Sequence, residues 1–201
     1  MSIRYPNGKP YKGSLSTPKQ RESTHRYGNR GKTLEDDLNA TNHYYREHGI
    51  AIVHKKPTPI QVVSVDYPKR SAAVIKEAYF RQPSTTDYNG VYKGLYLDFE
   101  AKETTGKTAF PLANIHEHQI GHMKQVLHQS GVCFFILRFT ATDEVYYMPG
   151  YVVITYWERM VAGGRKSMKK EEVERDGYKI PLGLSPRVDY IKIVDELHSP
   201  S

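Results

Sequence analysis

One short segment of the chain carries charged side chains that could together hydrolyse a phosphodiester. In residues 95–102 apolar and charged residues alternate, which predicts a strand with one apolar face and with Asp98, Glu100 and Lys102 on the other face. Carboxylate oxygens suit Mg²⁺, which keeps several water molecules that can act as nucleophiles. A lysine beside the metal supplies positive charge where the phosphorus transition state gathers negative charge. The alternative interpretation is an ordinary strand whose charged face is exposed to solvent.

A second carboxylate, Asp87, stands upstream of this strand in the segment 84–88. The dipeptide Asn89-Gly90 is typical of a tight hairpin turn, so we expect a turn there that brings Asp87 beside Glu100. The residues themselves therefore predict that Asp87 and Glu100 bind the metal and that Lys102 stabilises the transition state.

The elements that would position these residues follow from the hydrophobic pattern. Leu34, Leu38 and Tyr45 share one side of a helix that ends at Gly49. A second helix is predicted over residues 115–129, a charged helix near 169–175 and a terminal amphipathic segment over 188–197. Strands are predicted over residues 60–65, 72–80, 95–102, 132–139 and 145–148. This order predicts an α/β or α+β sandwich around one mixed central sheet flanked by helices.

The length of 201 residues and the hydrophobic content of 38% allow one sizeable core. No apolar run is long enough to span a membrane, and the first 30 residues resemble no secretory signal, so we expect a cytoplasmic protein with no membrane partner. The single cysteine, Cys133, lies in an apolar run and excludes an internal disulfide or a cysteine cluster for zinc.

All of the excess positive charge lies near the start of the chain. Residues 1–32 carry eight Lys or Arg and one acid, whereas the remaining residues balance to zero. The Gly, Pro, Ser and Thr content argues against packing, which predicts a disordered basic arm over residues 1–29 before a nuclease domain over 30–201. Such an arm favours a nucleic acid partner, and a merely solubilising tail is the alternative.

The predicted strands 60–65 and 72–80 would form a hairpin, within an insertion at about residues 58–82. A second basic patch lies on this hairpin. Between residues 55 and 81 the chain has six basic residues and two acidic ones. The basic residues could contact phosphates, and exposed aromatic rings could contact unstacked bases. The alternative is that these are two further strands of the main sheet. The predicted DNA contacts are Arg30, Lys55, Lys56, Lys69, Arg70, Lys76, Tyr67 and Phe80.

Two other motifs favour different chemistry only weakly. His118 and His122 stand one helical turn apart, as in zinc-binding helices, but the glutamate expected between them is missing. A histidine face turned to solvent or phosphate is the favoured interpretation. Residues 163–167 resemble a phosphate-binding loop without its leading glycine, and a basic turn is favoured.

The candidate site also resembles a known nuclease signature. Asp87 followed by Glu100-Ala101-Lys102 looks like the PD-(D/E)XK motif, with Thr86 where that motif has proline. The motif alone is weak, but its surroundings resemble the RecU family of junction resolvases of Gram-positive bacteria, from about residue 26 onward. The segments that carry this resemblance are 29–31 with Leu34-Glu35, 54–59, 67–71, 84–90 and 98–104.

This resemblance implies a restriction-endonuclease-like core with a projecting basic hairpin stalk. It implies a homodimer that resolves four-way junction DNA by paired symmetric nicks, with recombinase and branch-migration proteins as further partners. It also implies that Mg²⁺, with Mn²⁺ as a substitute, is held by four residues, that Lys102 stabilises the transition state, and that Glu35 holds a metal-bound water. The four implied metal-site residues are Thr85, Asp87, Glu100 and Gln119.

Two other functions remain open from the residues alone. A recombination accessory protein could bind DNA without catalysis, its acids being ordinary surface groups. A restriction-type enzyme could use the same chemistry on linear duplex DNA.

Overall fold

The protein is described here by a computed structural model that covers residues 33–66, 73–81 and 85–198. The predicted arm over residues 1–29 lies outside the described residues, as do the predicted DNA contacts Arg30, Tyr67, Lys69 and Arg70. The arm and its boundary with the nuclease domain therefore stay predictions.

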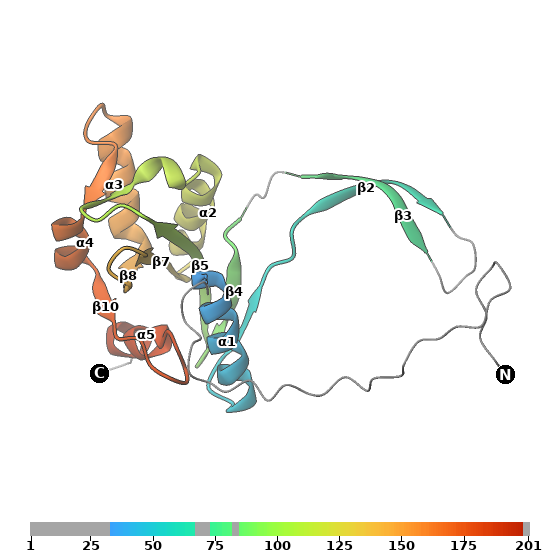
Figure 1. Cartoon of the computed structure of the whole chain (residues 1–201), viewed down its shortest axis with the longest axis horizontal. Helices are drawn as coiled ribbons and strands as arrows, with labels where there is room; N and C mark the ends of the chain where they lie inside the picture. Colours follow the sequence, from blue (N-terminus) through green and yellow to red (C-terminus); the bar gives the residue numbers. More distant parts are fainter. Residues whose placement is uncertain (1–32, 67–72, 82–84, 199–201) are drawn as a thin grey trace, which may run out of the picture. The chain divides into compact units, whose positions relative to one another are not determined.

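A six-stranded mixed sheet forms the centre of the molecule, with helices on both of its faces (Figure 1). β5 and β7 pair in parallel, and each of the other neighbouring pairs in this sheet is antiparallel. The predicted mixed α/β architecture is confirmed. In spatial order the strands are β1 (Ile52–Lys55), β4 (Tyr88–Tyr92), β5 (Leu95–Thr104), β7 (Val132–Phe139), β8 (Glu144–Pro149) and β10 (Tyr178–Ile180).

β7 shows how the sheet divides two hydrophobic cores. All eight of its residues are buried, as a continuous apolar strand covered on both faces requires. Phe134 and Ile136 pack on the face covered by α1 (Leu34–Glu47) and α5 (Tyr190–His198). Phe135 and Leu137 point to the opposite face, which α2 (Glu117–His128), α3 (Gly150–Val161) and α4 (Lys170–Asp176) cover. A small sheet of β6 (Ala109–Pro111) and β9 (Ser167–Lys169) and the short 3₁₀ helix η1 (Leu112–Asn114) complete the second face.

α1 begins at a capping box in which Thr33 accepts a hydrogen bond from the Asp36 backbone and the Asp36 side chain accepts one from Thr33. Leu34 and Leu38 are buried on its core side, as the spacing predicted. None of the helices in the described part of the chain is long and apolar enough to cross a membrane.

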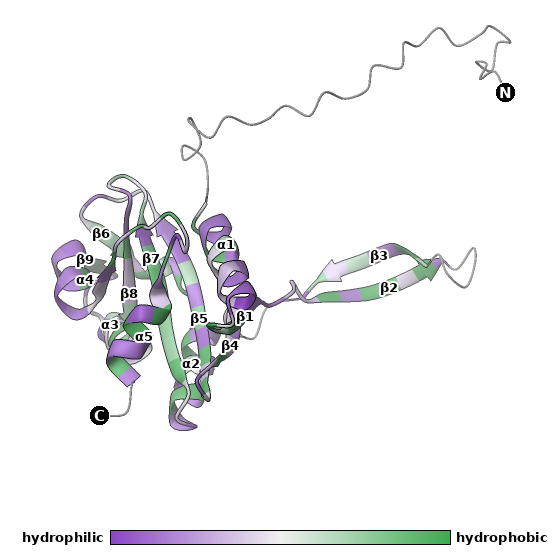
Figure 2. Ribbon diagram, turned by 90° about the horizontal axis from the view of Figure 1, so that it is seen from below, coloured by the Kyte–Doolittle hydropathy of each residue, from purple (hydrophilic) through white to green (hydrophobic). Residues whose placement is uncertain are grey.

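β2 (Ile60–Asp66) and β3 (Val74–Phe80) pair with each other and form a sheet of their own. Every residue of β3 is exposed, and both strands carry apolar as well as hydrophilic residues (Figure 2). The predicted hairpin strands are confirmed, and the alternative that they extend the main sheet is wrong.

The turn before β5 differs from the predicted one. Asn89 and Gly90 lie inside β4, where they pair with Asp98 and Leu97. The turn is formed by Lys93 and Gly94, whose φ values of 46° and 82° suit a two-residue hairpin loop.

Gly90 has a packing role instead of a turning role. A Cβ atom at this position would lie 2.1 Å from the carbonyl oxygen of Ile52 in β1. Glycine therefore allows β1 to approach β4 closely enough to pair.

Candidate metal and nuclease site

β5 presents the predicted charged face, and α2 covers that face. Leu97 and Phe99 pack in the core beneath α1 and α5, while the alternate residue Asp98 contacts His122 of α2. Asp98 and Glu100 are almost completely buried, with exposures of 0% and 1%. The predicted shared face is confirmed, and the alternative of a solvent-exposed charged strand is wrong.

Asp87 lies directly against Glu100, although the turn predicted between them is absent. Tyr88 in β4 pairs with Phe99 in β5, so the residue before β4 is held beside the middle of β5. The backbone N–H of Asp87 donates a hydrogen bond to Oε2 of Glu100 at 3.0 Å. Lys102 Nζ lies 2.8 Å from Glu100 Oε1. The two carboxylate residues and the lysine predicted to act together are therefore neighbours.

The raised pKa of the Glu100 carboxyl indicates that a cation beside it would be stabilising. Burial raises the pKa of Glu100 to about 7, the Lys102 ammonium opposes this rise, and the Asp87 carboxylate adds to it. Lys102 therefore compensates the buried charge only in part. A metal cation at the same carboxylate would stabilise its ionised form further.

The family resemblance implies four oxygen ligands for a metal ion at this site. Two carboxylates, the Thr85 hydroxyl and the Gln119 amide would supply hard oxygen ligands and leave positions for water. Across the residues that the structure describes, no three His, Cys, Asp or Glu side chains form a metal-binding cluster.

The side chains of Thr85 and Gln119 already have hydrogen-bond partners in the protein. Thr85 Oγ1 donates to the Thr86 carbonyl at 3.2 Å. Gln119 is buried, and its Oε1 accepts the backbone N–H of His116 at 3.0 Å, which caps the start of α2. A metal would have to share or replace this cap, so the implied ligand role of Gln119 stays a prediction.

Glu35 lies on the open side of the site. It lines a pocket of about 270 Å³ together with Asp87 and Lys102. Its Oε1 lies 2.5 Å from Lys55 Nζ, and both side chains are partly exposed. Glu35 therefore shares one pocket with two of the predicted catalytic residues, Asp87 and Lys102, and its role toward a metal-bound water stays a prediction.

Some of the residues predicted to contact DNA have exposed side chains, and others form contacts with the rest of the protein. Phe80 is 84% exposed on β3. Lys76 is exposed and pairs with Asp66 on the neighbouring strand at 2.8 Å. Lys56 differs from both, because its Nζ lies 2.9 Å from the buried Asp98 and 3.1 Å from Thr86 Oγ1. Lys56 thus contacts the buried Asp98 from a partly exposed position, and its contact with DNA stays a prediction.

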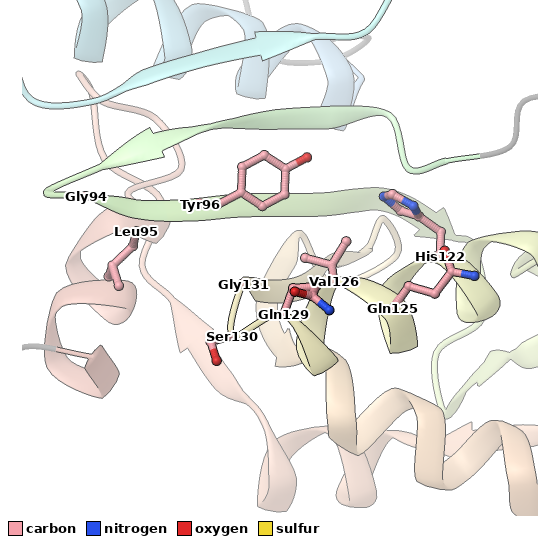
Figure 3. Close-up of a pocket in the computed structure, with 9 residues that line it drawn as sticks. All are labelled: Gly94, Leu95, Tyr96, His122, Gln125, Val126, Gln129, Ser130 and Gly131. Carbon is pink, nitrogen blue, oxygen red and sulfur yellow. The ribbon is translucent and has the colours of Figure 1, made fainter.

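Sequence reasoning missed the network around Asp98. The alternation placed Asp98 on the charged face, but it gave no signal for the partners that surround it. Tyr96 donates to Asp98 Oδ2 at 2.9 Å, and His122 Nε2 lies 3.2 Å from the same oxygen. Tyr96 and His122 also line a pocket of about 480 Å³ between β5 and α2 (Figure 3).

Comparison with known proteins gives a consistent result over almost the whole chain. The family model for recombination protein U, RecU, matches residues 29–196. A protein of Geobacillus sp. (strain WCH70) named Holliday junction resolvase RecU is 61% identical over 98% of this chain and 98% of its own. Proteins of the same name from Geobacillus thermodenitrificans and Bacillus licheniformis are each 59% identical, covering 98% and 99% of this chain and 98% and 100% of their own. A family match and identities of this size over nearly full length leave one conclusion: the chain belongs to the recombination protein U family.

Proposed function

We propose that this protein is a Mg²⁺-dependent endonuclease that resolves Holliday junctions by paired symmetric nicks during homologous recombination and DNA repair. The observation that carries the proposal is the group of Asp87, the buried Glu100 and Lys102, joined by contacts of 3.0 and 2.8 Å. The substrate follows from the relatives, whose shared name is Holliday junction resolvase RecU.

In phosphodiester hydrolysis the two carboxylates of the group have one task and the lysine has another. Asp87 and Glu100 would hold the metal, and Thr85 and Gln119 would supply neutral oxygen atoms. Bound Mg²⁺ would supply a water of lowered pKa and neutralise charge on the phosphate, and Mn²⁺ could replace it. Lys102 stabilises negative charge on the transition state, because its ammonium is fixed beside Glu100. Glu35 orients water in the adjoining pocket.

Recognition of the junction is assigned to the hairpin and the basic arm. Lys55 and Lys76 lie on or near the hairpin strands and are partly exposed, and Phe80 offers a bare apolar ring to an unstacked base. Arg30, Lys69, Arg70 and Tyr67 are proposed to add phosphate and base contacts. A homodimer would supply two such sites, one for each of the strands cut symmetrically. Recombinase and branch-migration proteins are proposed as partners in the cytoplasm.

The deciding experiment compares cleavage of a synthetic four-way junction with cleavage of its separate duplex arms. The full-length protein is assayed with increasing Mg²⁺ and, as a control, with the metal removed by a chelator. We expect paired nicks in the junction, no cleavage of the arms and no cleavage without metal. Equal cleavage of junction and arms would favour a restriction-type nuclease. Binding without any metal-dependent cleavage would favour a non-catalytic accessory protein.

A further inference from the structure

Asp98 is the most deeply buried carboxylate of the charged face, and it lies outside the set of residues assigned to the metal. It has an exposure of 0%. The Thr86 hydroxyl donates to Asp98 Oδ1. Asp98 Oδ2 is contacted by Lys56 Nζ at 2.9 Å, by the Tyr96 hydroxyl at 2.9 Å and by His122 Nε2 at 3.2 Å.

These partners come from separate parts of the chain. Lys56 follows β1 and Thr86 precedes β4. Tyr96 lies in β5 itself, and His122 lies on α2. A buried carboxylate is stable only when its charge and its lone pairs are satisfied, so all of these segments must keep their places together. Asp98 thereby fixes β1, β4 and α2 against β5.

The same contacts lead directly to the metal candidates. The backbone N–H of Lys56 donates to the Asp87 carbonyl at 2.7 Å, while its ammonium contacts Thr86 and Asp98. Lys56 thus binds Asp87 through its backbone N–H and binds Thr86, the residue before Asp87, through its side-chain ammonium. Glu100 stands two residues beyond Asp98 on the same face of β5. Asp98 and its partners therefore connect the segment that carries Asp87 with the strand that carries Glu100, in addition to the direct bond between these two residues.

We propose that Asp98, together with Lys56, is a positioning residue that holds Asp87 and Glu100 at the separation needed for one metal ion. This proposal rests on the proposed nuclease function. Asp98 does not touch the metal in this scheme, because protein donors already occupy both of its oxygens. Lys56 acts through its contacts inside the protein.

The test measures Mg²⁺ binding as well as cleavage in the full-length protein. Asp98→Asn keeps the size of the side chain and removes its charge. We expect Mg²⁺ affinity, measured by titration calorimetry with the metal alone, to fall by about 10- to 100-fold, the usual effect of losing a group that orients metal ligands. The Mg²⁺ concentration for half-maximal junction cleavage should rise by the same factor, and cleavage at saturating metal should largely recover.

A matched control separates positioning from general stability. Tyr190→Phe removes another buried hydrogen bond, from the Tyr190 hydroxyl of α5 to Asn42 of α1 at 2.5 Å, on the opposite face of the sheet. It should lower the melting temperature and leave Mg²⁺ affinity unchanged. An equal fall in Mg²⁺ affinity in the two variants would overturn the positioning role.

A second variant keeps the proposal testable if Asp98→Asn does not fold. The double variant Lys56→Met with Asp98→Asn removes both charges and leaves no unpaired ion in the core. We expect it to fold with weakened Mg²⁺ affinity, whereas Lys56→Arg alone should keep most of that affinity. Wild-type Mg²⁺ affinity in the folded double variant would contradict the positioning role of Asp98 and Lys56. Failure of the proposed function would look different, because the wild-type protein itself would then bind Mg²⁺ without cutting junctions.

Discussion

The backbone N–H of Asp87 donates to the Glu100 carboxylate at 3.0 Å, although thirteen residues separate them in the chain. This bond joins the residue that precedes β4 to the middle of β5. It uses the backbone N–H of Asp87, while the Asp87 carboxylate itself contributes to the raised pKa of Glu100. A buried acid whose pKa lies near 7 thus stands beside a second acid and a lysine. Perturbed acids grouped in this way are common in catalytic sites.

Neutral replacements at the two carboxylates should separate cleavage from binding. Asp87→Asn or Glu100→Gln keeps the side-chain size and removes a metal-binding charge. We expect cleavage to be lost while binding to a four-way junction is retained or becomes tighter, because repulsion of the phosphate is reduced. Cleavage rates and gel-shift affinities at saturating Mg²⁺ measure both effects. Wild-type rates in either variant would remove that residue from the site.

Lys102→Ala should lower the rate of cleavage much more than the affinity for Mg²⁺. The ammonium lies beside Glu100, and its loss removes one preorganised charge contact, which costs at least about a hundredfold in rate. Single-turnover cleavage of a junction at saturating Mg²⁺ gives the rate, and calorimetry gives the metal affinity. A rate within a few-fold of wild type would show that the lysine has no part in catalysis.

The raised pKa of Glu100 predicts a definite pH dependence of stability. Its ordinary value is 4.5 and its value in the fold is about 7, so the folded protein binds this proton more tightly than the unfolded chain. The contribution of Glu100 to the stability of the metal-free protein is therefore full below pH 4.5 and is lost as the pH rises to about 7.

Thermal unfolding with and without Mg²⁺ measures this dependence. At about pH 8 the ion should raise the melting temperature more than at about pH 5.5, since a protonated carboxyl does not bind metal. Glu100→Gln is the control and should lose most of this pH dependence. An equal Mg²⁺ effect at both pH values in the wild-type protein would contradict the predicted protonation.

Removal of residues 1–29 should weaken DNA binding without a large loss of stability. The segment holds six basic residues and one acid, so its loss removes five net positive charges. We expect lower junction affinity and a shallower dependence of the binding constant on salt, because fewer counterions are released. Salt titrations of binding and a melting curve provide the measurements. A large fall in melting temperature would mean that this segment packs against the fold.

Replacement of the β2–β3 hairpin by a short Gly-Ser turn tests where junction recognition lies. The hairpin is a sheet of its own with exposed strands, so the main sheet does not depend on it for pairing. We expect a folded, Mg²⁺-binding protein whose preference for junction over duplex collapses. Competition binding and cleavage assays measure that preference. Unimpaired selectivity would place recognition elsewhere, and an unfolded protein would assign the hairpin to the core.

The charged face and the hairpin could be predicted because both depend on local pattern. Alternation along β5 is enough to place Glu100 and Lys102 on the face opposite Phe99. Runs of β-branched residues likewise predicted β2 and β3. These features need no knowledge of distant parts of the chain.

The errors and omissions concern packing between distant segments. Asn89-Gly90 is a strong turn signal, yet Gly90 is required by the nearness of the Ile52 carbonyl, which no local rule reveals. The partners of Asp98 were missed for the same reason, since Lys56 is 42 residues away in sequence. Lys56 was predicted to contact DNA because it lies in a basic segment, and that pattern gave no sign of its contact with Asp98.

The hairpin also has a consequence for how quickly the chain can fold. β1 and β4 are neighbours in the main sheet, although β2 and β3 separate them in sequence. β2 and β3 are consecutive strands, and such hairpins form within about 1–10 μs. Once they pair, Pro59 and Arg81 are joined by a backbone hydrogen bond of 2.9 Å, so the loop that remains to be closed between β1 and β4 is much shorter. Because loop closure costs entropy that grows with loop length, early hairpin formation lowers the entropy cost of pairing β1 with β4.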